Sequence, residues 1–134
     1  MPVGTVAIFS PGDMGHAVGR LLREHELRVV TCLTGRSART RQLSGQAGIT
    51  ELPTMEETVK QSDIVLSITV SEAVPALCRE VAAAIKDTRS DVLFAECNAI
   101  TPDLARCMGS LIVGAGGRFV DASIIGGTHQ SDIV

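Results

Sequence analysis

The residues of this chain that could do chemistry begin with a glycine-containing turn, residues 10–15, with the sequence SPGDMG. An apolar run precedes the turn, and a pattern typical of an amphipathic helix follows it. A strand, a glycine turn and a helix in this order form the phosphate-binding end of a dinucleotide fold. Gly12 would let the backbone approach a pyrophosphate, Gly15 would let the helix pack close to the strand, and the helix N-terminus offers free N–H groups to the anion. Ser10 replaces the first glycine of G-x-G-x-x-G, so the turn taken alone is also compatible with a purely structural role.

A second group of polar residues follows the next apolar run, residues 28–33. A site for NAD places a carboxylate about 20 residues after the glycines, where it accepts a hydrogen bond from the ribose 2′-hydroxyl. This chain has Thr34 there, and Arg36 and Ser37 follow it. An arginine and a hydroxyl at the start of a helix suit a 2′-phosphate. We therefore expect Thr34, Arg36 and Ser37 to bind the adenosine end of NADP, whereas the next two arginines fit a solvated helix face equally well.

Polar residues also stand at the ends of the fourth and fifth apolar runs. The carboxyl ends of parallel strands line the ligand crevice of an open α/β sheet. We expect Thr69 and Val70 to face a cofactor through backbone groups, and the Asn98 amide to bind the nicotinamide ribose or carboxamide. Structural alternatives stay open at both places, with Ser71 as a helix cap and Asn98 as an ordinary turn residue.

The last candidate segment, residues 119–127, reads FVDASIIGG. Its paired glycines expose backbone N–H groups that suit a substrate anion. We expect Ser123, Gly126 and Gly127 to bind substrate, although two glycines after a strand are most often only a turn.

The elements that must position these residues alternate regularly along the chain. Thr54 with Glu57 forms a capping box, and Thr101 with Pro102 is a typical helix start. We expect strands at residues 3–9, 28–33, 49–52, 63–69, 91–97 and 118–124, and helices at 16–24, 38–43, 55–61, 72–85 and 102–113. Short connections and right-handed crossovers make this an α/β fold, a Rossmann-type doubly wound parallel sheet in three layers. We expect residues 1–134 to form one domain.

Composition excludes several classes of function. The formal net charge is −3, and the chain has three Phe but no Trp or Tyr. A nucleic-acid surface needs basic charge and stacking rings, so we expect no nucleic-acid partner. No apolar run has the length of a membrane span, and the N-terminus lacks the charged and hydrophobic regions of a secretion signal. We therefore expect a cytoplasmic protein without a membrane partner, while self-association into a homo-oligomer stays open.

The thiols and imidazoles show no metal-binding pattern. The chain has four cysteines without C-x-x-C spacing and three histidines far apart in sequence. We expect reduced thiols that belong to the structure, and no metal site.

Taken together, four segments resemble the NAD(P)-binding domain of the 6-phosphogluconate dehydrogenase and 3-hydroxyacid (3-hydroxyisobutyrate) dehydrogenase superfamily. AIFSPGDMGHAVGRLL is similar to the family's G-x-G-x-M-G turn, and TCLTGRS to its second-strand turn. ECNAITP resembles its D-x-S/N-S/T-I-S-P segment, and FVDASIIGG its D-A-P-V-S-G-G substrate motif. The resemblance covers almost the whole chain. Within the superfamily, the chain is most similar to a little-characterised branch.

The resemblance implies a role for each matching position. It implies pyrophosphate binding at the turn formed by Ser10, Pro11, Gly12, Asp13, Met14 and Gly15. It implies 2′-phosphate binding at Arg36 and Ser37, a nicotinamide contact at Asn98, and a substrate edge after Asp121. The chain departs from the family at Ser10, at Ala99, where a hydroxyl is frequent, and at Ile125, which replaces the serine of V-S-G-G and so puts a direct substrate hydrogen bond in doubt.

The resemblance also implies hydride transfer between NADP, or NAD, and a small hydroxy acid or a related carbonyl or imine. In the family, a helical second domain follows the sixth strand and supplies an acid/base lysine, and this chain has no matching segment. Hydride transfer needs a proton donor or acceptor within reach of the reacting oxygen, so we expect no catalytic residue in this chain, and small-molecule substrate binding only with a second domain. The competing hypothesis is a non-catalytic NADP(H)-binding module, or a truncated fragment, that acts through a partner chain.

Overall fold

The computed structural model describes residues 4–9, 13–32, 48–69 and 71–122. Within them, six strands form one parallel sheet in the order β3-β2-β1-β4-β5-β6. In chain order the elements are β1 (Thr5–Phe9), α1 (Asp13–Glu24), β2 (Arg28–Thr31), β3 (Thr50–Glu51), α3 (Met55–Gln61), β4 (Ile64–Ser67), a 3₁₀ turn η1 (Ser71–Ala73), α4 (Val74–Thr88), β5 (Leu93–Glu96), α5 (Pro102–Gly114) and β6 (Arg118–Asp121). The predicted helix at 38–43 lies outside the described residues.

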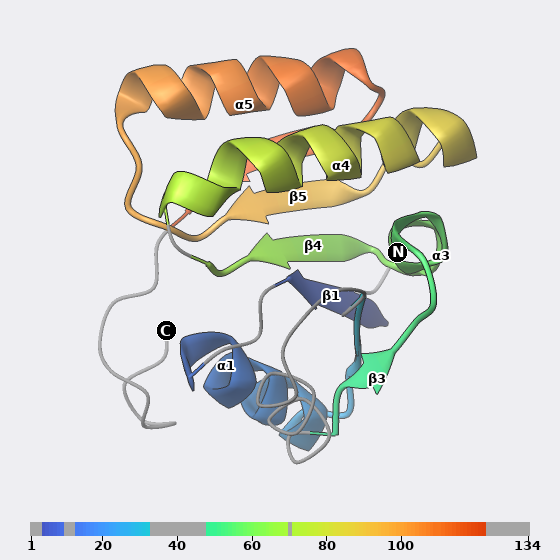
Figure 1. Ribbon diagram of the computed structural model, residues 1–134. Coiled ribbons are helices and arrows are strands. Elements are labelled where there is room, and N and C mark those ends of the chain that lie inside the picture. The colour runs from blue at the N-terminus through green and yellow to red at the C-terminus, as the bar shows by residue number, and fades with distance from the viewer. Residues whose placement is uncertain (1–3, 10–12, 33–47, 70, 123–134) are drawn as a thin grey trace.

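The helices cover the sheet from both sides. Helices α4 and α5 lie side by side on one face of the sheet, and α1 lies on the opposite face (Figure 1). Helix α3 packs against α4. The strand order reverses between β1 and β4, which are neighbours in the sheet although helices on opposite faces lead away from them. The structure therefore confirms the predicted doubly wound, three-layered α/β fold.

The larger part of the core lies under α3, α4 and α5. Phe94 of β5 is fully buried there, and its ring stacks on that of Phe119 from β6 with centroids 5.9 Å apart. Val59 of α3 and Ile112 of α5 are fully buried in the same cluster. Val65 of β4 belongs to this core as well, and it lies on the same face of the sheet as Phe94 and Phe119.

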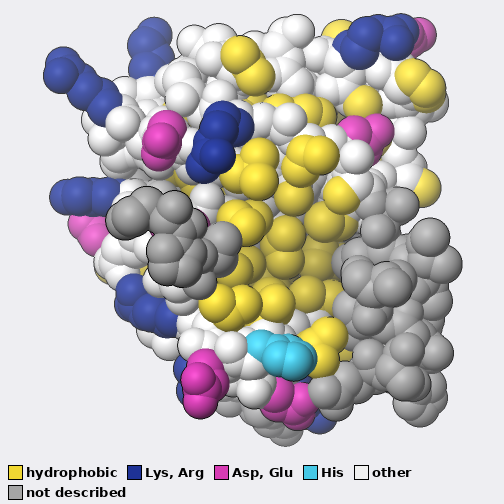
Figure 2. All heavy atoms as spheres, turned by 180° about the vertical axis from the view of Figure 1, so that it is seen from behind, with side chains coloured by type: hydrophobic (Ala, Val, Ile, Leu, Met, Phe, Trp, Pro, Cys, Tyr) yellow, Lys and Arg dark blue, Asp and Glu magenta, His cyan; other side chains and the backbone are white. Residues whose placement is uncertain are grey.

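The opposite face of the sheet has a smaller cluster, formed where α1 packs on β1 and β2. Val18 of α1 meets Ile8 of β1 and Val29 of β2 there. Beyond α1, this face of the sheet also has apolar residues: Leu66 of β4 is half-buried and Val120 of β6 is 42% exposed. Figure 2, which views the molecule from behind relative to Figure 1, shows hydrophobic side chains gathered in the middle of the surface.

Two predicted helix caps are confirmed and a third is wrong, and α1 begins at Asp13 and not at residue 16. The Thr54 hydroxyl accepts a hydrogen bond from the Glu57 N–H at 3.1 Å, and the Thr101 hydroxyl accepts one from the Leu104 N–H at 3.2 Å. Ser71 is not the cap of α4. The residues 71–73 form the 3₁₀ turn, and α4 begins at Val74 after a residue without a side-chain cap bond. The proline in the first helical turn fixes φ there, so the chain enters α4 without needing a polar cap.

The strands β4 and β5 are shorter than their apolar runs suggest. Asp63 precedes β4, and its side chain accepts hydrogen bonds from the backbone N–H groups of Gly4 and Thr5. At the other end of β4, the Thr69 N–H donates to the Asn98 side chain and not to a neighbouring strand. A side-chain bond thus replaces strand pairing at the Thr69 N–H, whereas Asp63 keeps backbone hydrogen bonds with Thr5 and Leu93.

Candidate functional site

The predicted site residues fall into two sets. Ten lie outside the described residues and remain predictions: Ser10, Pro11, Gly12, Thr34, Arg36, Ser37, Val70, Ser123, Gly126 and Gly127. The described ones are Asp13, Met14 and Gly15 in the first turn of α1, Thr69 after β4, and Asn98 after β5. All of these follow the carboxyl end of a strand, so the fold brings them to one edge of the sheet.

Helix α1 begins four positions after the end of β1, as the predicted phosphate-binding turn requires. Its close approach to the sheet depends on Gly19, which is buried against Ile49 and Ile8. A Cβ atom at this position would lie 2.6 Å from Ile49 Cδ1 and 3.5 Å from Ile8 Cδ1. The sequence interpretation expected close packing at Gly15, which stays a prediction, and did not single out Gly19. The G-x-x-x-G spacing of the two, which places them on one side of the helix, was the available signal.

The Asn98 side chain joins the carboxyl ends of β4 and β5. Its Oδ1 accepts a hydrogen bond from the Thr69 N–H at 2.9 Å. Its Nδ2 donates to the Ser67 carbonyl oxygen at 3.2 Å, to the Ser67 hydroxyl at 3.3 Å and to Glu96 Oε1 at 2.5 Å. The amide therefore directs both of its ends at the protein, and its expected contact with a cofactor stays a prediction.

Glu96 is the residue at the centre of this cluster. It is the last residue of β5, and its relative exposure is 0%. Its Oε1 also accepts the Asn98 backbone N–H at 3.0 Å, and the Ser67 hydroxyl bonds to its carboxyl group. Its Oε2 is buried, and within the described part of the chain it has no hydrogen-bond partner.

Burial dominates the electrostatics of the cluster. It raises the pKa of Glu96, because the charged carboxylate loses its hydration, and the like charge of Asp121 raises it further. The hydrogen bonds from Asn98 and Ser67 oppose this change. Burial also raises the pKa of Cys78, on α4, to about 12 and that of Cys97 to about 11, and Glu96 adds to both shifts. The carboxyl end of β5 is thus a site where negative charge is unfavourable.

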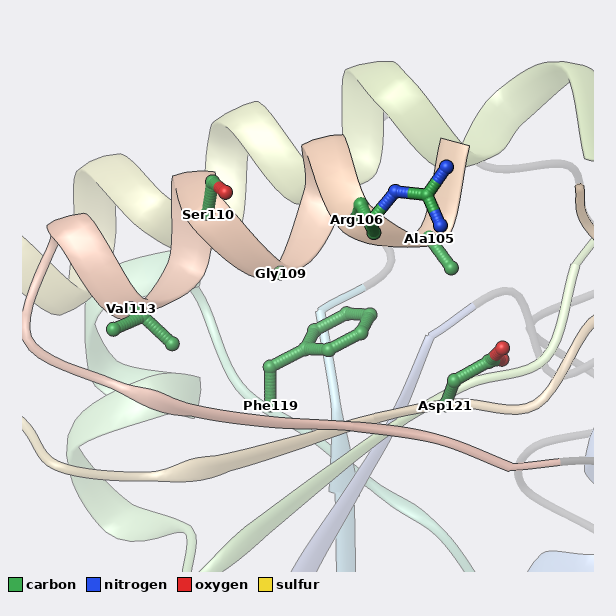
Figure 3. Close-up of a pocket in the computed structure, with 7 residues that line it drawn as sticks. All are labelled: Ala105, Arg106, Gly109, Ser110, Val113, Phe119 and Asp121. Carbon is green, nitrogen blue, oxygen red and sulfur yellow. The ribbon is translucent and has the colours of Figure 1, made fainter. Parts of the chain in front are cut away.

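A shallow groove of about 450 Å³ lies beside this cluster, between α5 and β6. In Figure 3 the Phe119 ring lies below Gly109 of α5, while Arg106 and Asp121 lie toward the same end of the groove. Gly109 lets the Phe119 ring pack close to α5, since a Cβ there would lie 3.1 Å from Phe119 Cδ1. Asp121 is the β6 residue paired in register with Glu96, so the groove adjoins the polar cluster at the carboxyl edge.

The chain's two lysines lie away from this edge. Lys60 is in the last turn of α3 and Lys86 in the last turn of α4, and both are exposed. Each helix runs back from the carboxyl edge of the sheet to its amino edge before the next strand starts. The two ammonium groups therefore belong to the opposite edge from Thr69, Glu96 and Asn98.

All four cysteines are free, but their settings differ: Cys78 is buried, Cys32 and Cys97 are half-buried, and Cys107 is exposed. Among the described residues, no group of three His, Cys, Asp or Glu side chains has the arrangement of a metal site. The same part of the chain contains no helix long and apolar enough to span a membrane.

Glu96, within the motif ECNAITP, is the second residue that sequence reasoning missed. The signal was present: a carboxylate within an apolar strand, two residues after Phe94, must lie on the same face as that phenylalanine. A charged residue predicted for the core is rarely buried without a partner or a function.

Comparisons with known proteins agree with this architecture. A family model, the NAD binding domain of 6-phosphogluconate dehydrogenase, matches residues 5–132. Among solved structures, a conserved protein of unknown function that is structurally similar to 3-hydroxyacid dehydrogenases matches with a TM-score of 0.82 and 26% identity, over 96% of this chain and 46% of its own. A search of curated proteins gave no significant match.

Two further structures match with the same fold at lower identity. The 3-hydroxyisobutyrate dehydrogenase of Mycobacterium tuberculosis, with L-serine, has a TM-score of 0.78 and 22% identity, over 95% of this chain and 42% of that one. An imine reductase of Myxococcus stipitatus, in complex with NADP⁺, has a TM-score of 0.75 and 19% identity, over 92% and 42%. This chain spans somewhat less than half the length of the solved structures it matches.

Proposed function

Since this chain belongs to the family of the NAD binding domain of 6-phosphogluconate dehydrogenase, we propose that it binds a nicotinamide dinucleotide at the carboxyl edge of its sheet. The observation that carries the proposal is the polar cluster of Ser67, Glu96 and Asn98 at the ends of β4 and β5. It lies next to the point between β1 and β4 where the strand order reverses, and open α/β sheets bind their ligands there.

The residues present fit such a ligand in two respects. Helix α1 starts four positions after the end of β1, and the first N–H groups of a helix have no partner within the helix, which suits a pyrophosphate. The polar cluster of Ser67, Glu96 and Asn98 lies at the same edge of the sheet, beside the place where we put the nicotinamide half. In this proposal the turn 10–15 holds the pyrophosphate, and the segments after β4 and β5 flank the nicotinamide half.

We assign a preference for NADP over NAD. The support is the sequence after β2, where Arg36 and Ser37 stand in place of the carboxylate that selects a free ribose 2′-hydroxyl. An arginine at that position would pair with a 2′-phosphate. The imine reductases that share this fold include complexes with NAD⁺ and with NADP⁺, so NAD is the alternative tested below.

The reaction proposed for the whole protein is hydride transfer to or from a small hydroxy acid, or a related carbonyl or imine. The nicotinamide ring supplies the hydride chemistry when it is bound. This chain would bind and orient the dinucleotide. The proton donor or acceptor would come from a further stretch of polypeptide, because Lys60 and Lys86 belong to the wrong edge of the sheet. A non-catalytic NADP(H)-binding module is the second candidate, and the lack of a suitably placed lysine among the described residues favours it.

Titration of the 134-residue chain with NADPH and with NADH tests the proposal, followed by the fluorescence of the reduced cofactor or by calorimetry. We expect NADPH to bind more tightly than NADH. Arg36→Ala should raise the Kd for NADPH about tenfold and leave that for NADH nearly unchanged, because one charge-assisted pair is lost. Arg79→Ala, which removes an exposed arginine of α4, is the matched control and should change neither.

Three results would contradict parts of this assignment. Binding of neither cofactor overturns the dinucleotide site. Equal binding of the two cofactors, unaffected by Arg36→Ala, overturns the 2′-phosphate assignment. Dehydrogenase turnover by the isolated chain overturns the claim that the acid/base group lies elsewhere.

A further inference from the structure

A row of polar side chains crosses the carboxyl end of the sheet. Ser67 of β4, Glu96 of β5 and Asp121 of β6 are paired in register on neighbouring strands. Their side chains lie on the face that carries α4 and α5, because each is two residues after a core residue of its own strand, such as Phe94 before Glu96. Of the two carboxylates, Asp121 is exposed and Glu96 is fully buried.

A buried glutamate at this position is costly. An apolar side chain of similar volume would fill the space beside the buried Cys78 without losing hydration. Glu96 accepts two hydrogen bonds from one residue, Asn98, through its backbone N–H at 3.0 Å and its Nδ2 at 2.5 Å. These bonds select one orientation of the Asn98 amide, with Nδ2 toward Glu96 and Oδ1 toward the Thr69 N–H.

The consequence concerns the two chain segments that leave β4 and β5. Thr69 stands two residues after β4, and Asn98 two residues after β5. The Thr69 N–H and the Asn98 amide are joined by a bond of 2.9 Å, so the direction of both segments depends on the same amide. The Glu96 carboxyl group, which orients this amide, is fully buried.

We propose that Glu96 is a positioning residue for the nicotinamide half of the dinucleotide, acting through the Asn98 amide on the segments that follow β4 and β5. This inference rests on the proposed function. Glu96 contributes no contact with the adenosine end, because β2, where we place adenosine recognition, lies on the other side of β1 in the sheet. Loss of the Glu96 acceptor therefore affects one half of the ligand and spares the other.

Two substitutions of Glu96 distinguish the effect of its hydrogen-bond acceptor from the effect of its side-chain volume. Glu96→Gln keeps the volume and an acceptor oxygen for both Asn98 donors, but removes the charge. Glu96→Leu keeps a similar volume and removes the acceptor. Calorimetry with NADPH and with the fragment 2′,5′-ADP, on the intact chain, measures the two halves of the ligand separately, and far-UV circular dichroism checks the fold of each variant.

We expect Glu96→Leu to weaken NADPH binding by about tenfold while 2′,5′-ADP binding stays within about twofold of the native value. Glu96→Gln should keep NADPH affinity within about threefold of native. Should Glu96→Leu fail to fold, Ser67→Ala provides the second test, because it removes a hydroxyl that bonds to both Glu96 and Asn98. Ser67→Ala should weaken NADPH binding by about threefold, again without an effect on the binding of 2′,5′-ADP.

The outcomes distinguish this inference from the proposed function. Native protein that binds neither NADPH nor 2′,5′-ADP overturns the proposed function itself. Native protein that binds both, with unchanged NADPH affinity in Glu96→Leu, overturns the positioning role alone. An equal loss of affinity for both ligands in Glu96→Leu also overturns the positioning role, because it indicates general destabilisation. A loss of NADPH affinity in Glu96→Gln as large as in Glu96→Leu overturns it too, because it indicates a requirement for charge.

Discussion

Asp63 and Glu96 stand at opposite ends of the same sheet and have opposite surroundings. Asp63 precedes β4 at the amino edge and is exposed, and its Oδ2 accepts the N–H groups of Gly4 and Thr5 at 2.9 and 3.0 Å. These two bonds lower the pKa of Asp63. Glu96 ends β5 at the carboxyl edge, where burial raises its pKa and one of its oxygens has no partner among the described residues.

The difference separates a structural end of the sheet from the end where we propose the ligand site. At the amino edge, a solvated carboxylate satisfies backbone groups of a neighbouring strand and needs nothing further. At the carboxyl edge, a carboxyl group is held in the interior at a cost in hydration, and it orients an amide beside the expected ligand. Proteins place such unfavourable groups at functional sites and compensate for them elsewhere in the fold.

Asn98→Ala, at the carboxyl edge, should have the largest effect on stability. This change removes the link between β4 and β5 and leaves the buried Glu96 carboxyl without its side-chain donor from Asn98. We expect a loss of about 3 kcal/mol in the free energy of unfolding, because buried polar groups lose their partners. Urea unfolding followed by far-UV circular dichroism measures it, and a loss below about 1 kcal/mol would contradict the central role of the amide.

The corresponding change at the amino edge, Asp63→Ala, should cost less. The two N–H groups that it frees lie at an exposed position where water can replace the lost acceptor. We expect a loss of about 1 kcal/mol in the same urea experiment. Asp87→Ala on the exposed side of α4 is the control for removing a surface carboxylate. A loss for Asp63→Ala as large as that for Asn98→Ala would remove the distinction between the two edges.

The pH dependence of stability should differ in sign between the two carboxylates. The folded pKa of Asp63 is lowered, so its contribution is present above its ordinary pKa of 3.8 and is lost as the pH falls through the folded value. The folded pKa of Glu96 is raised, so its contribution is present below its ordinary pKa of 4.5 and is lost as the pH rises through the folded value.

Unfolding curves of the native chain, Asp63→Asn and Glu96→Gln over a range of pH values test these signs. Relative to Asp63→Asn, the native chain should lose stability toward acid. Relative to Glu96→Gln, it should lose stability as the pH rises from 4.5. Parallel curves for the native chain and Glu96→Gln would show that Glu96 does not titrate differently in the folded state.

The smallest effect concerns the thiols next to Glu96. With pKa values raised to about 12 and about 11, Cys78 and Cys97 carry little thiolate at pH 8, and iodoacetamide should label the exposed Cys107 first. Glu96→Gln removes a negative charge near both protected thiols, so their labelling should become about twofold faster. Mass spectrometry of the digested protein measures each rate, and unchanged rates at both cysteines would place the Glu96 charge elsewhere.

Much of the fold could be predicted from local patterns. Apolar runs alternating with amphipathic segments predicted the parallel sheet, and the helix starts at Thr54 and Thr101 were predicted from capping residues and confirmed. The prediction that Ser71 caps α4 used the same rule and was wrong, because the proline of α4 makes a polar cap unnecessary. Local rules work where the bonds they invoke span only three or four residues.

The sequence by itself determined the doubly wound architecture, the place of Thr69 and Asn98 at strand ends, and the family to which these segments are similar. Only the tertiary structure decided that the Asn98 amide bonds to Thr69, 29 residues earlier in the chain, and that Glu96 is buried behind it. It also assigned the close packing of α1 to Gly19. The physical reason is the same in each case: the partner atoms belong to strands or helices far apart in sequence, and their distances are set by the register of the sheet and the packing of its layers.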